Sequence, residues 1–320
     1  MKFFHKIGLL LLPVFGFSQA DSLASPYFES YDEKISTHIF ILNKLNSFSL
    51  YFPADDLTLE MSPNAETTLN IGVNYDIVSF SFGYAPKFFR NNDPADKSRM
   101  LAFQFSLFPK RFAQHAEFYY QKGMNLEVTG TDASVYLPNM KTLKIGGSTA
   151  YVFNPDYSFR ATQFQNARQI KSAGTFAPGI AYYYTELNGR KELDMGEKIW
   201  FADFAIFPAY HYNWVIAKYV QAMGGLALGP GLTVTRDDQT DVSFLLYGNL
   251  NLGLGYNSNT WYGGVNARAQ IATHDAANQV AIGDYIGYFS AFVGYRFDAP
   301  EFVSKTMSDL KRRNPLQKKA

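Results

Sequence analysis

The chain has 320 residues, with 29 lysines and arginines against 28 acidic residues, so its formal net charge is +1. This balance argues against a nucleic-acid partner, because replacing phosphate counterions needs a surplus of cations. The sequence has no cysteine, which excludes disulfides, thiolate metal sites and a cysteine nucleophile. Aromatic residues make up 17% and charged residues only 18%, against roughly 25% charged in an average soluble domain. With no apolar stretch long enough for a helical span, two classes remain: a large soluble β protein or a membrane barrel.

The first twenty residues have the three parts of a secretory signal peptide. Lys2 and Lys6 form a basic start, an apolar run follows from Ile7 to Phe17, and Ser18-Gln19-Ala20 supplies small residues at a cleavage site. The apolar part is too short to span a membrane as a helix. A cysteine-free exported chain fits the envelope of a Gram-negative cell, where an oxidising compartment traps stray thiols.

Apolar and polar residues alternate along most of the chain, which predicts strands. One set of alternate positions is apolar and includes Leu69, Ile71, Val73, Leu101, Phe103, Phe244, Leu246, Leu250, Leu252 and Leu254. The intervening positions carry amides and small residues, such as Asn70, Gln104, Asn249 and Asn251, instead of many lysines and glutamates. Several strands also exceed ten residues. Both features favour an all-β, antiparallel transmembrane β-barrel, with lipid on the apolar face and a wet lumen on the other.

The connections between the predicted strands alternate in length. Short turns are expected at 74–76, 109–112, 213–214 and 257–259, and long polar loops at 53–65, 86–98, 123–141, 186–199, 229–242 and 274–282. Outer-membrane barrels have short periplasmic turns and longer outer loops. Six long loops imply about 12 strands, with both chain ends in the periplasm.

These patterns divide the chain into consecutive parts. We expect a signal peptide at 1–20, a periplasmic N-terminal segment at 21–34, the barrel at 35–297 and a basic periplasmic tail at 298–320. About twenty residues stand where a short turn is due, and we interpret 154–172 as a short inserted helical segment. This segment would plug the lumen or cap its periplasmic mouth.

The inserted segment also carries a sequence signature. Ser158-Phe159-Arg160-Ala161, followed by Gln169 and Ser172-Ala173-Gly174, resembles a Ser-aromatic-Arg-Ala … Gln-x-x-Ser-Ala-Gly stretch in a family of uncharacterised Bacteroidota proteins. The resemblance extends over most of the chain, from about Tyr31 to Val303. It implies an outer-membrane β-barrel with a domain of unknown function, and it implies no reaction.

The candidate functional residues are a polar network inside the barrel. Its members are Arg160, Arg168, Gln169, Lys171 and Ser172 of the inserted segment and Glu117, Asp203, Arg268 and Arg296 of the wall. In one interpretation the cations of the segment meet acids such as Glu117 and Asp203 and set the selectivity of a pore. In the other, the network only satisfies buried polar groups in a narrow barrel.

An enzyme is the competing interpretation, because some barrels of this membrane are hydrolases. His115, His211 and His274 could serve as bases, but the sequence has no Gly-x-Ser-x-Gly or His-Glu-x-x-His motif. His274 is expected near the outer rim and the other two near the periplasmic ends of their strands, so the three are not expected to meet. We predict no catalytic residues, cofactor or metal site.

The sequence therefore predicts an outer-membrane barrel of a Gram-negative cell with a structural or transport-type role, such as a small channel or solute passage. Its expected partners are the lipid bilayer, with lipopolysaccharide as a further contact, and the barrel-assembly machinery. A barrel enzyme acting on lipid or peptide is the first alternative. A secreted soluble β-sandwich is the second.

Overall fold

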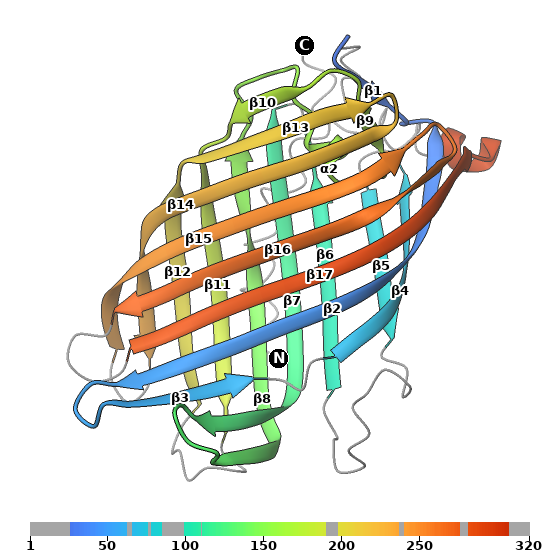
Figure 1. The fold of residues 1–320 in the computed structure, drawn as a ribbon. Coiled ribbons are helices and arrows are strands. Elements are labelled where there is room, and N and C mark those ends of the chain that lie inside the picture. The colour runs from blue at the N-terminus through green and yellow to red at the C-terminus, as the bar shows by residue number, and fades with distance from the viewer. Residues whose placement is uncertain are drawn as a thin grey trace.

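The computed structural model describes residues 26–62, 66–75, 78–84, 99–109, 111–189, 198–236, 240–275 and 281–306. These residues form one large antiparallel sheet that curls into a barrel, with a small two-stranded sheet at one end (Figure 1). Within them, no helix has both the length and the apolar character needed to cross a membrane. The signal peptide predicted at 1–20 lies outside the described residues.

A closed ring of hydrogen-bonded strands forms the wall. Over the described parts of the chain, ten strands follow one another around this ring in the order β2, β17, β16, β15, β14, β12, β11, β8, β7 and β3, and β3 pairs with β2 to close it. The strands are β2 (Lys34–Phe52), β3 (Leu57–Ser62), β7 (Phe112–Val128), β8 (Ser134–Tyr151), β11 (Gly179–Asn188), β12 (Ile199–Phe207), β14 (Val220–Arg236), β15 (Thr240–Asn257), β16 (Trp261–Asp275) and β17 (Ala281–Asp298).

Three further strands lie between β2 and β7, beside the part of β2 (residues 35–44) with which β3 does not pair. β4 (Glu66–Tyr75) pairs with β2, β5 (Val78–Tyr84) pairs with β4, and β6 (Arg99–Leu107) pairs with β7. β5 and β6 are neighbours, but no ladder of hydrogen bonds joins them in the residues that the structure describes. The predicted count of 12 strands is therefore not confirmed, since the hydrogen-bonded ring closes through β3 with ten.

Two wall strands continue past a proline. β10 (Ala173–Phe176) extends β11 beyond Pro178, and β13 (Ala209–Ala217) extends β12 beyond Pro208, because β10 and β13 pair in the same register as β11 and β12. Proline has no N–H, so it interrupts the ladder without turning the chain. The short turn predicted at 213–214 is wrong, because β13 runs through it and the chain reverses between Ala217 and Val220.

Two predicted long loops are mostly strand. β7 and β8 extend to Val128 and from Ser134, so the segment 123–141 is a hairpin. β14 runs through Pro230 to Arg236, so most of the loop predicted at 229–242 is wall. Glycine and proline in these segments indicate a loop by composition, but in long barrel strands they allow curvature and close approach of neighbouring strands. We call this end of the barrel the loop end and the opposite end the plug end.

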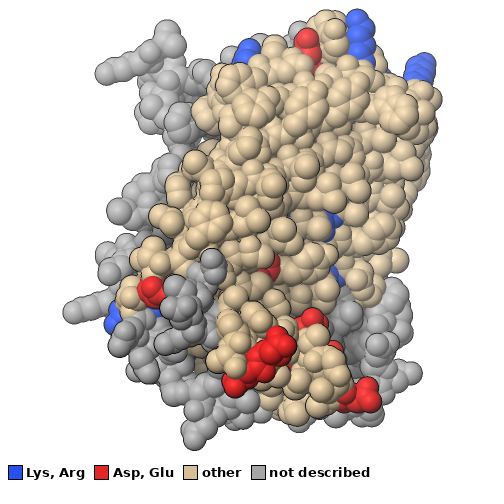
Figure 2. All heavy atoms as spheres, turned by 60° about the vertical axis from the view of Figure 1, so that its left-hand side comes forward, with Lys and Arg blue, Asp and Glu red and all other residues tan. Residues whose placement is uncertain are grey.

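The apolar faces of the strands point outward. Leu250, Leu252 and Leu254 of β15 are 41–49% exposed, whereas Asn249, next to Leu250, is 8% exposed and faces the lumen. Figure 2 shows a broad band of surface with almost no charge, while charged residues gather toward the two ends. The predicted face assignment is confirmed, and the alternative of a soluble sandwich is wrong, because these leucines do not meet in a core between two sheets.

If lipid covers the outer face, a charged substitution lowers stability more near the middle of the membrane than near its surfaces. We expect Leu252→Arg, in the middle of β15, to lower the free energy of unfolding in lipid bilayers by about 2–4 kcal/mol. Val242→Arg is the matched control, because Val242 faces outward near the loop end of the same strand and should lose only about 0–1 kcal/mol. Equal losses for the two variants, measured by denaturant titration, would contradict a lipid-facing surface.

Candidate functional site in the barrel lumen

The polar faces of the wall strands line a narrow lumen that side chains fill in layers. Apolar side chains occupy the loop end, ion pairs cross the middle, two cavities follow, and a folded segment fills the plug end. Each layer joins strands that are distant in the sequence and face one another across the barrel.

An apolar cluster closes the loop end of the lumen. Its members are Phe48, Met61, Met124, Leu137, Met140, Leu187 and Phe201, all 5% exposed or less. Phe48 on β2 and Phe201 on β12 stand on opposite sides of the ten-strand ring, and their ring centroids are 6.5 Å apart. Among the described residues, this contact between opposite walls fills the lumen with apolar side chains at this level.

Ion pairs tie opposite walls together below this cluster. Lys144 Nζ on β8 lies 2.5 Å from Asp284 Oδ2 on β17, and Arg268 Nη1 on β16 lies 2.6 Å from Glu117 Oε1 on β7. Asp203 Oδ1 is 3.0 Å from His274 Nε2, closer to the apolar cluster. All these side chains are buried or nearly so.

The pair around Glu117 is the most completely bonded. Tyr119 donates its hydroxyl to Glu117 Oε2 at 2.9 Å, and Gln104 donates to the Tyr119 oxygen at 2.6 Å. Arg268 also donates to Gln270 Oε1 at 2.9 Å. Burying an ion costs several kcal/mol, and pairing offsets this cost only when further hydrogen bonds satisfy the remaining polar atoms. The bonds around Glu117 and Arg268 meet this condition and hold these side chains in one arrangement.

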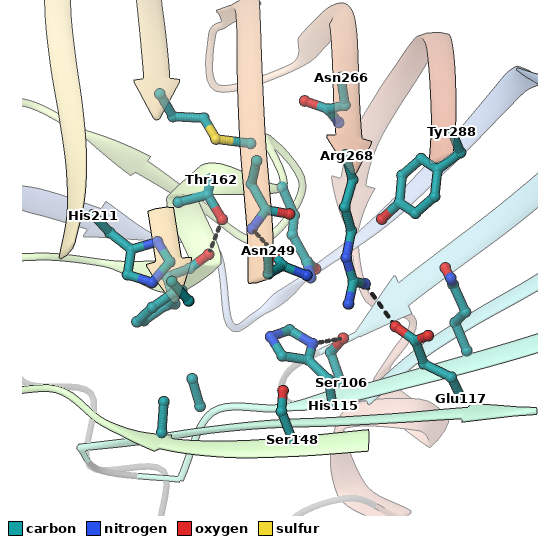
Figure 3. A pocket seen from close by; sticks show the side chains of 18 of the residues that line it. Ser106, His115, Glu117, Ser148, Thr162, His211, Asn249, Asn266, Arg268 and Tyr288 are labelled. Carbon is teal, nitrogen blue, oxygen red and sulfur yellow. Dashed lines mark hydrogen bonds and ion pairs between the residues drawn. The ribbon is translucent and has the colours of Figure 1, made fainter. Parts of the chain in front are cut away.

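Two adjoining cavities lie between the ion pairs and the plug end. Cavity 1 has a volume of about 200 Å³ and is lined by Glu117, His115, Arg268 and His211 (Figure 3). Cavity 2 has a volume of about 190 Å³. The two share the lining residues Gln104, Ser106, Gln163, Asn266 and Tyr288, so together they form one chamber with both polar and apolar walls.

The sequence did not predict the grouping of histidines in this chamber. His115 and His211 both line cavity 1, although we expected them to stay apart, and only His274 stands elsewhere, as predicted. Ser106 and the Nδ1 atom of His115 are within hydrogen-bond distance at 2.8 Å (Figure 3). Neighbouring strands β6 and β7 place these two residues directly opposite each other in register.

The inserted segment folds across the plug end as α2 (Phe159–Thr162), a helix of four residues, and β9 (Ala167–Gln169). β9 pairs with β1 (Phe28–Ser30). Ser158 caps the helix by accepting a hydrogen bond from the backbone N–H of Ala161. A short helix is therefore present as predicted, but it is only a small part of the segment.

Arg296 fixes the middle of this plug. The side chain is 1% exposed and donates to the carbonyls of Phe164 at 2.5 Å, Gln165 at 2.7 Å and Ser258. Phe164 has a φ of 58°, a left-handed conformation that a bulky side chain adopts only when its surroundings enforce it. The guanidinium group lies between the rings of Tyr31 and Tyr262, with 4.3 Å to each centroid. Burial raises the pKa of Tyr31 to about 12, so this ring stays neutral beside the cation.

Amide side chains fasten the rest of the plug to the wall. Gln169 Oε1 accepts from Asn213 Nδ2 at 3.1 Å and from the backbone N–H of Ser158 at 3.2 Å. Gln221 donates to the carbonyl of Ala161 at 2.7 Å, and Asn257 donates to that of Ala167 at 3.0 Å. These bonds join backbone groups of the plug to side chains of the plug and the wall, so the plug is a built part of the fold.

The predicted polar network separates into two groups in the structure. Arg160 pairs with Asp32 and Arg168 pairs with Glu29 at 2.8 Å, so the plug cations meet acids of the N-terminal segment. Lys171 lies over the Tyr27 ring, and Ser172 accepts from the backbone N–H of Val215. The prediction that plug cations meet Glu117 and Asp203 is wrong, because Arg268 and His274 occupy those acids from the barrel wall.

Four buried lumen residues were not predicted as members of the polar network: Lys44, Asp284, Asn213 and Gln221. Each stands at a lumen-facing position of its strand, and each is 3% exposed or less. Strand parity could have placed all four on the lumen side. The partner of each depends on which strands face one another across the barrel, and that follows only from the ring order.

The Arg296 contacts lead to a stability prediction. We expect Arg296→Met to lower the free energy of unfolding by about 3 kcal/mol, because buried carbonyls of the plug lose their donors. Arg111→Met is the matched control, since Arg111 donates to the carbonyl of Phe153 at 2.8 Å in an exposed position and should cost about 1 kcal/mol or less. Equal losses in a denaturant titration would show that Arg296 does not fix the plug.

The barrel resembles solved outer-membrane proteins in general architecture. The outer membrane protease OmpT from Escherichia coli aligns with 9% identity over 84% of this chain and 98% of its own, with a TM-score of 0.38. The translocator domain of the autotransporter NalP from Neisseria meningitidis aligns with 12% identity over 92% and 96%, with a TM-score of 0.36. The outer membrane protein OprG from Pseudomonas aeruginosa aligns with 8% identity over 85% and 100%, with a TM-score of 0.27. At these values nothing about their activities follows for this chain.

Sequence comparison identifies the family. No curated protein matches the sequence. The model of a family described as a domain of unknown function, DUF4421, matches residues 19–297, which includes every wall strand, the plug and both cavities. The chain therefore belongs to the DUF4421 family.

Proposed function

We propose that this protein is a transport-type barrel of the outer membrane that is closed at rest and holds a small solute in its central chamber. The observation that carries the proposal is the chamber itself, which lies between an apolar closure at one end and a hydrogen-bonded plug at the other.

The outer surface supports a membrane location. Large apolar side chains on every side of the wall are about 40–60% exposed, among them Ile71, Phe204, Leu226, Leu252 and Phe289. A continuous apolar surface of this size is unfavourable on a monomer in water. A closed barrel satisfies its backbone hydrogen bonds between neighbouring strands, so it can lie in lipid. The predicted signal peptide and Gram-negative origin complete this part of the proposal, with the lipid bilayer as the partner of the wall.

Connection lengths support an orientation. Tight turns join β13 to β14 and β15 to β16 at the plug end, and two connections at the loop end, β5 to β6 and β11 to β12, are longer in sequence. Barrels of this class place short turns in the periplasm, so the plug faces the periplasm. We also propose that 12 strands surround the lumen near the plug end, where β4, β5 and β6 lie between β2 and β7.

Conductance distinguishes a closed barrel from an open channel. We expect no conductance steps in planar bilayers from the wild-type protein, nor from a variant in which a short Gly-Ser turn replaces residues 154–172. The apolar contact between Phe48 and Phe201 still closes the loop end in that variant. Adding Phe48→Ala and Phe201→Ala to it should produce small steps.

Two results would contradict the proposal. Steps from the wild-type protein would indicate an open channel. An absence of conductance steps from the combined variant, with its folding verified by heat-modifiable gel mobility, would indicate that the chamber is not on a transport route.

An enzyme is the second candidate, because Ser106 and His115 lie 2.8 Å apart in the wall of cavity 1. A histidine can activate a serine as a nucleophile when an acid orients the ring. The nearest carboxylate on the same strand, Glu117, is held by Arg268 instead. We therefore rank hydrolysis below transport.

A fluorophosphonate probe separates the two candidates. If the barrel is a serine hydrolase, the probe should modify Ser106, and Ser106→Ala and His115→Gln should both abolish the modification. We expect no modification of the wild-type protein in detergent or in liposomes, measured by intact mass. Labelling at Ser106 that depends on His115 would favour the enzyme.

A further inference from the structure

The seam between β5 and β6 differs from the other neighbouring pairs of the wall. Ladders of backbone hydrogen bonds join β4 to β5 and β6 to β7, but none joins β5 to β6 in the described residues. The two strands still lie side by side. Unpaired strand edges at membrane depth are unfavourable, so this seam needs another group to satisfy it.

Cavity 2 reaches this seam. Ser81 and Gly83 of β5 and Gln104 and Ser106 of β6 all line it. Phe80 also lines the cavity, although it is 57% exposed on the outer face of β5. The cavity therefore extends from the lumen to an outward-facing side chain, and the residues beside the seam on β5 are small.

A cation without an acidic partner borders the same cavity. Lys44 lines cavity 2, is 1% exposed, and its Nζ atom has no hydrogen-bond partner. It lies over the Tyr119 ring, 2.7 Å from the centroid. The two acids within electrostatic reach of Lys44 are already paired: Glu117 with Arg268 and Asp284 with Lys144. A lysine side chain has several rotatable bonds, so the ammonium group can turn from the ring to an anion in the cavity.

The remaining lining matches a ligand with one polar end and one apolar end. Phe40, Leu42, Phe80 and Phe292 supply apolar surface, and Asn266 has an amide oxygen without a partner. Binding sites for small molecules are mostly apolar with a few polar groups that fix orientation. A volume of about 190 Å³ admits a molecule of the size of a single substituted aromatic ring.

We propose that cavity 2 binds a small organic anion with an apolar body, that Lys44 receives the anionic group, and that the ligand enters from the membrane between β5 and β6. The proposal rests on the proposed transport function and adds its substrate class and its route. The route opens no hydrogen-bond ladder and leaves both lumen closures in place.

The ligand class is tested with 4-fluorobenzoate, using 4-fluorobenzyl alcohol as its neutral analogue. We expect ¹⁹F NMR titration of the full chain in detergent to show at least tenfold tighter binding of the anion. Lys44→Met should remove that preference, and Lys44→Gln should do the same if the first variant folds poorly. Lys34→Met is the matched control, because Lys34 does not line the cavity and its Nζ atom lies 3.8 Å from Asp298. Equal affinity for the two probes, or an unchanged preference in both Lys44 variants, would overturn the proposed anion site.

The route is tested by bridging the seam in a chain that has no natural cysteine. Ser81→Cys with Ser106→Cys, linked by dibromobimane, should slow the exchange of bound 4-fluorobenzoate at least tenfold. Ala181→Cys with Ala205→Cys is the control, since these residues are register partners in the paired strands β11 and β12, and linking them should change nothing. Unchanged exchange after the seam is linked would overturn the lateral route.

These outcomes are separable from the conductance experiment. If the conductance results hold and 4-fluorobenzoate shows no preference over the alcohol, the transport function stands and the substrate class is wrong. If the anion binds through Lys44 and the combined variant stays silent in bilayers, the site stands and the transport route through the barrel is wrong.

Discussion

The structure depends on one constraint, which is that the apolar faces of the wall strands point outward from a closed ring. Polar side chains of the strands must then face inward, and a ring of ten strands leaves them little space. Side chains from opposite walls therefore meet. Charges in such a lumen lose most of their hydration, so a charge without a partner within hydrogen-bond distance is unfavourable. The wall-to-wall pairs of Lys144 with Asp284 and Arg268 with Glu117 follow from this constraint.

The two closures of the lumen use different physics. At the loop end, Phe48 and Phe201 meet through dispersion and the hydrophobic effect, which tolerate sliding and repacking. At the plug end, Arg296, Gln169 and Gln221 bond to specific backbone groups, and the geometry of those bonds is exacting. The apolar end can therefore loosen by small steps, whereas the plug must exchange several bonds at once before it moves.

Strand faces could be predicted from the sequence, because alternation is a local property. Leu252 and Asn249 fall on opposite sides of β15 by parity alone, and the structure places them so. Strand ends could not be predicted as well. A turn was predicted at 213–214 and a loop at 229–242, which contains Pro230, yet 213–214 and most of 229–242 lie within wall strands, because neighbouring strands supply the bonds of the ladder.

The candidate site was only half predictable for a different reason. On β2 the alternation is blurred, since Phe40 and Leu42 line the lumen side while Asn43 faces outward. Lys44 was missed in this mixed stretch. The partners of Glu117 and Asp203 depend on which strands stand across from one another, and the distance between paired residues along the chain reaches 151 positions. No local pattern contains that information.

The distribution of hydrogen bonds also decides which part of the barrel can yield to a passing solute. Axial passage requires the plug to release the carbonyls of Phe164 and Ala161 and the apolar cluster to part. Passage between β5 and β6 requires neither, because those strands share no ladder in the described residues and small side chains line the gap on β5. Motions follow the segments with the fewest bonds to break. The proposed exchange of a ligand therefore uses the seam between β5 and β6 and not the axis of the barrel.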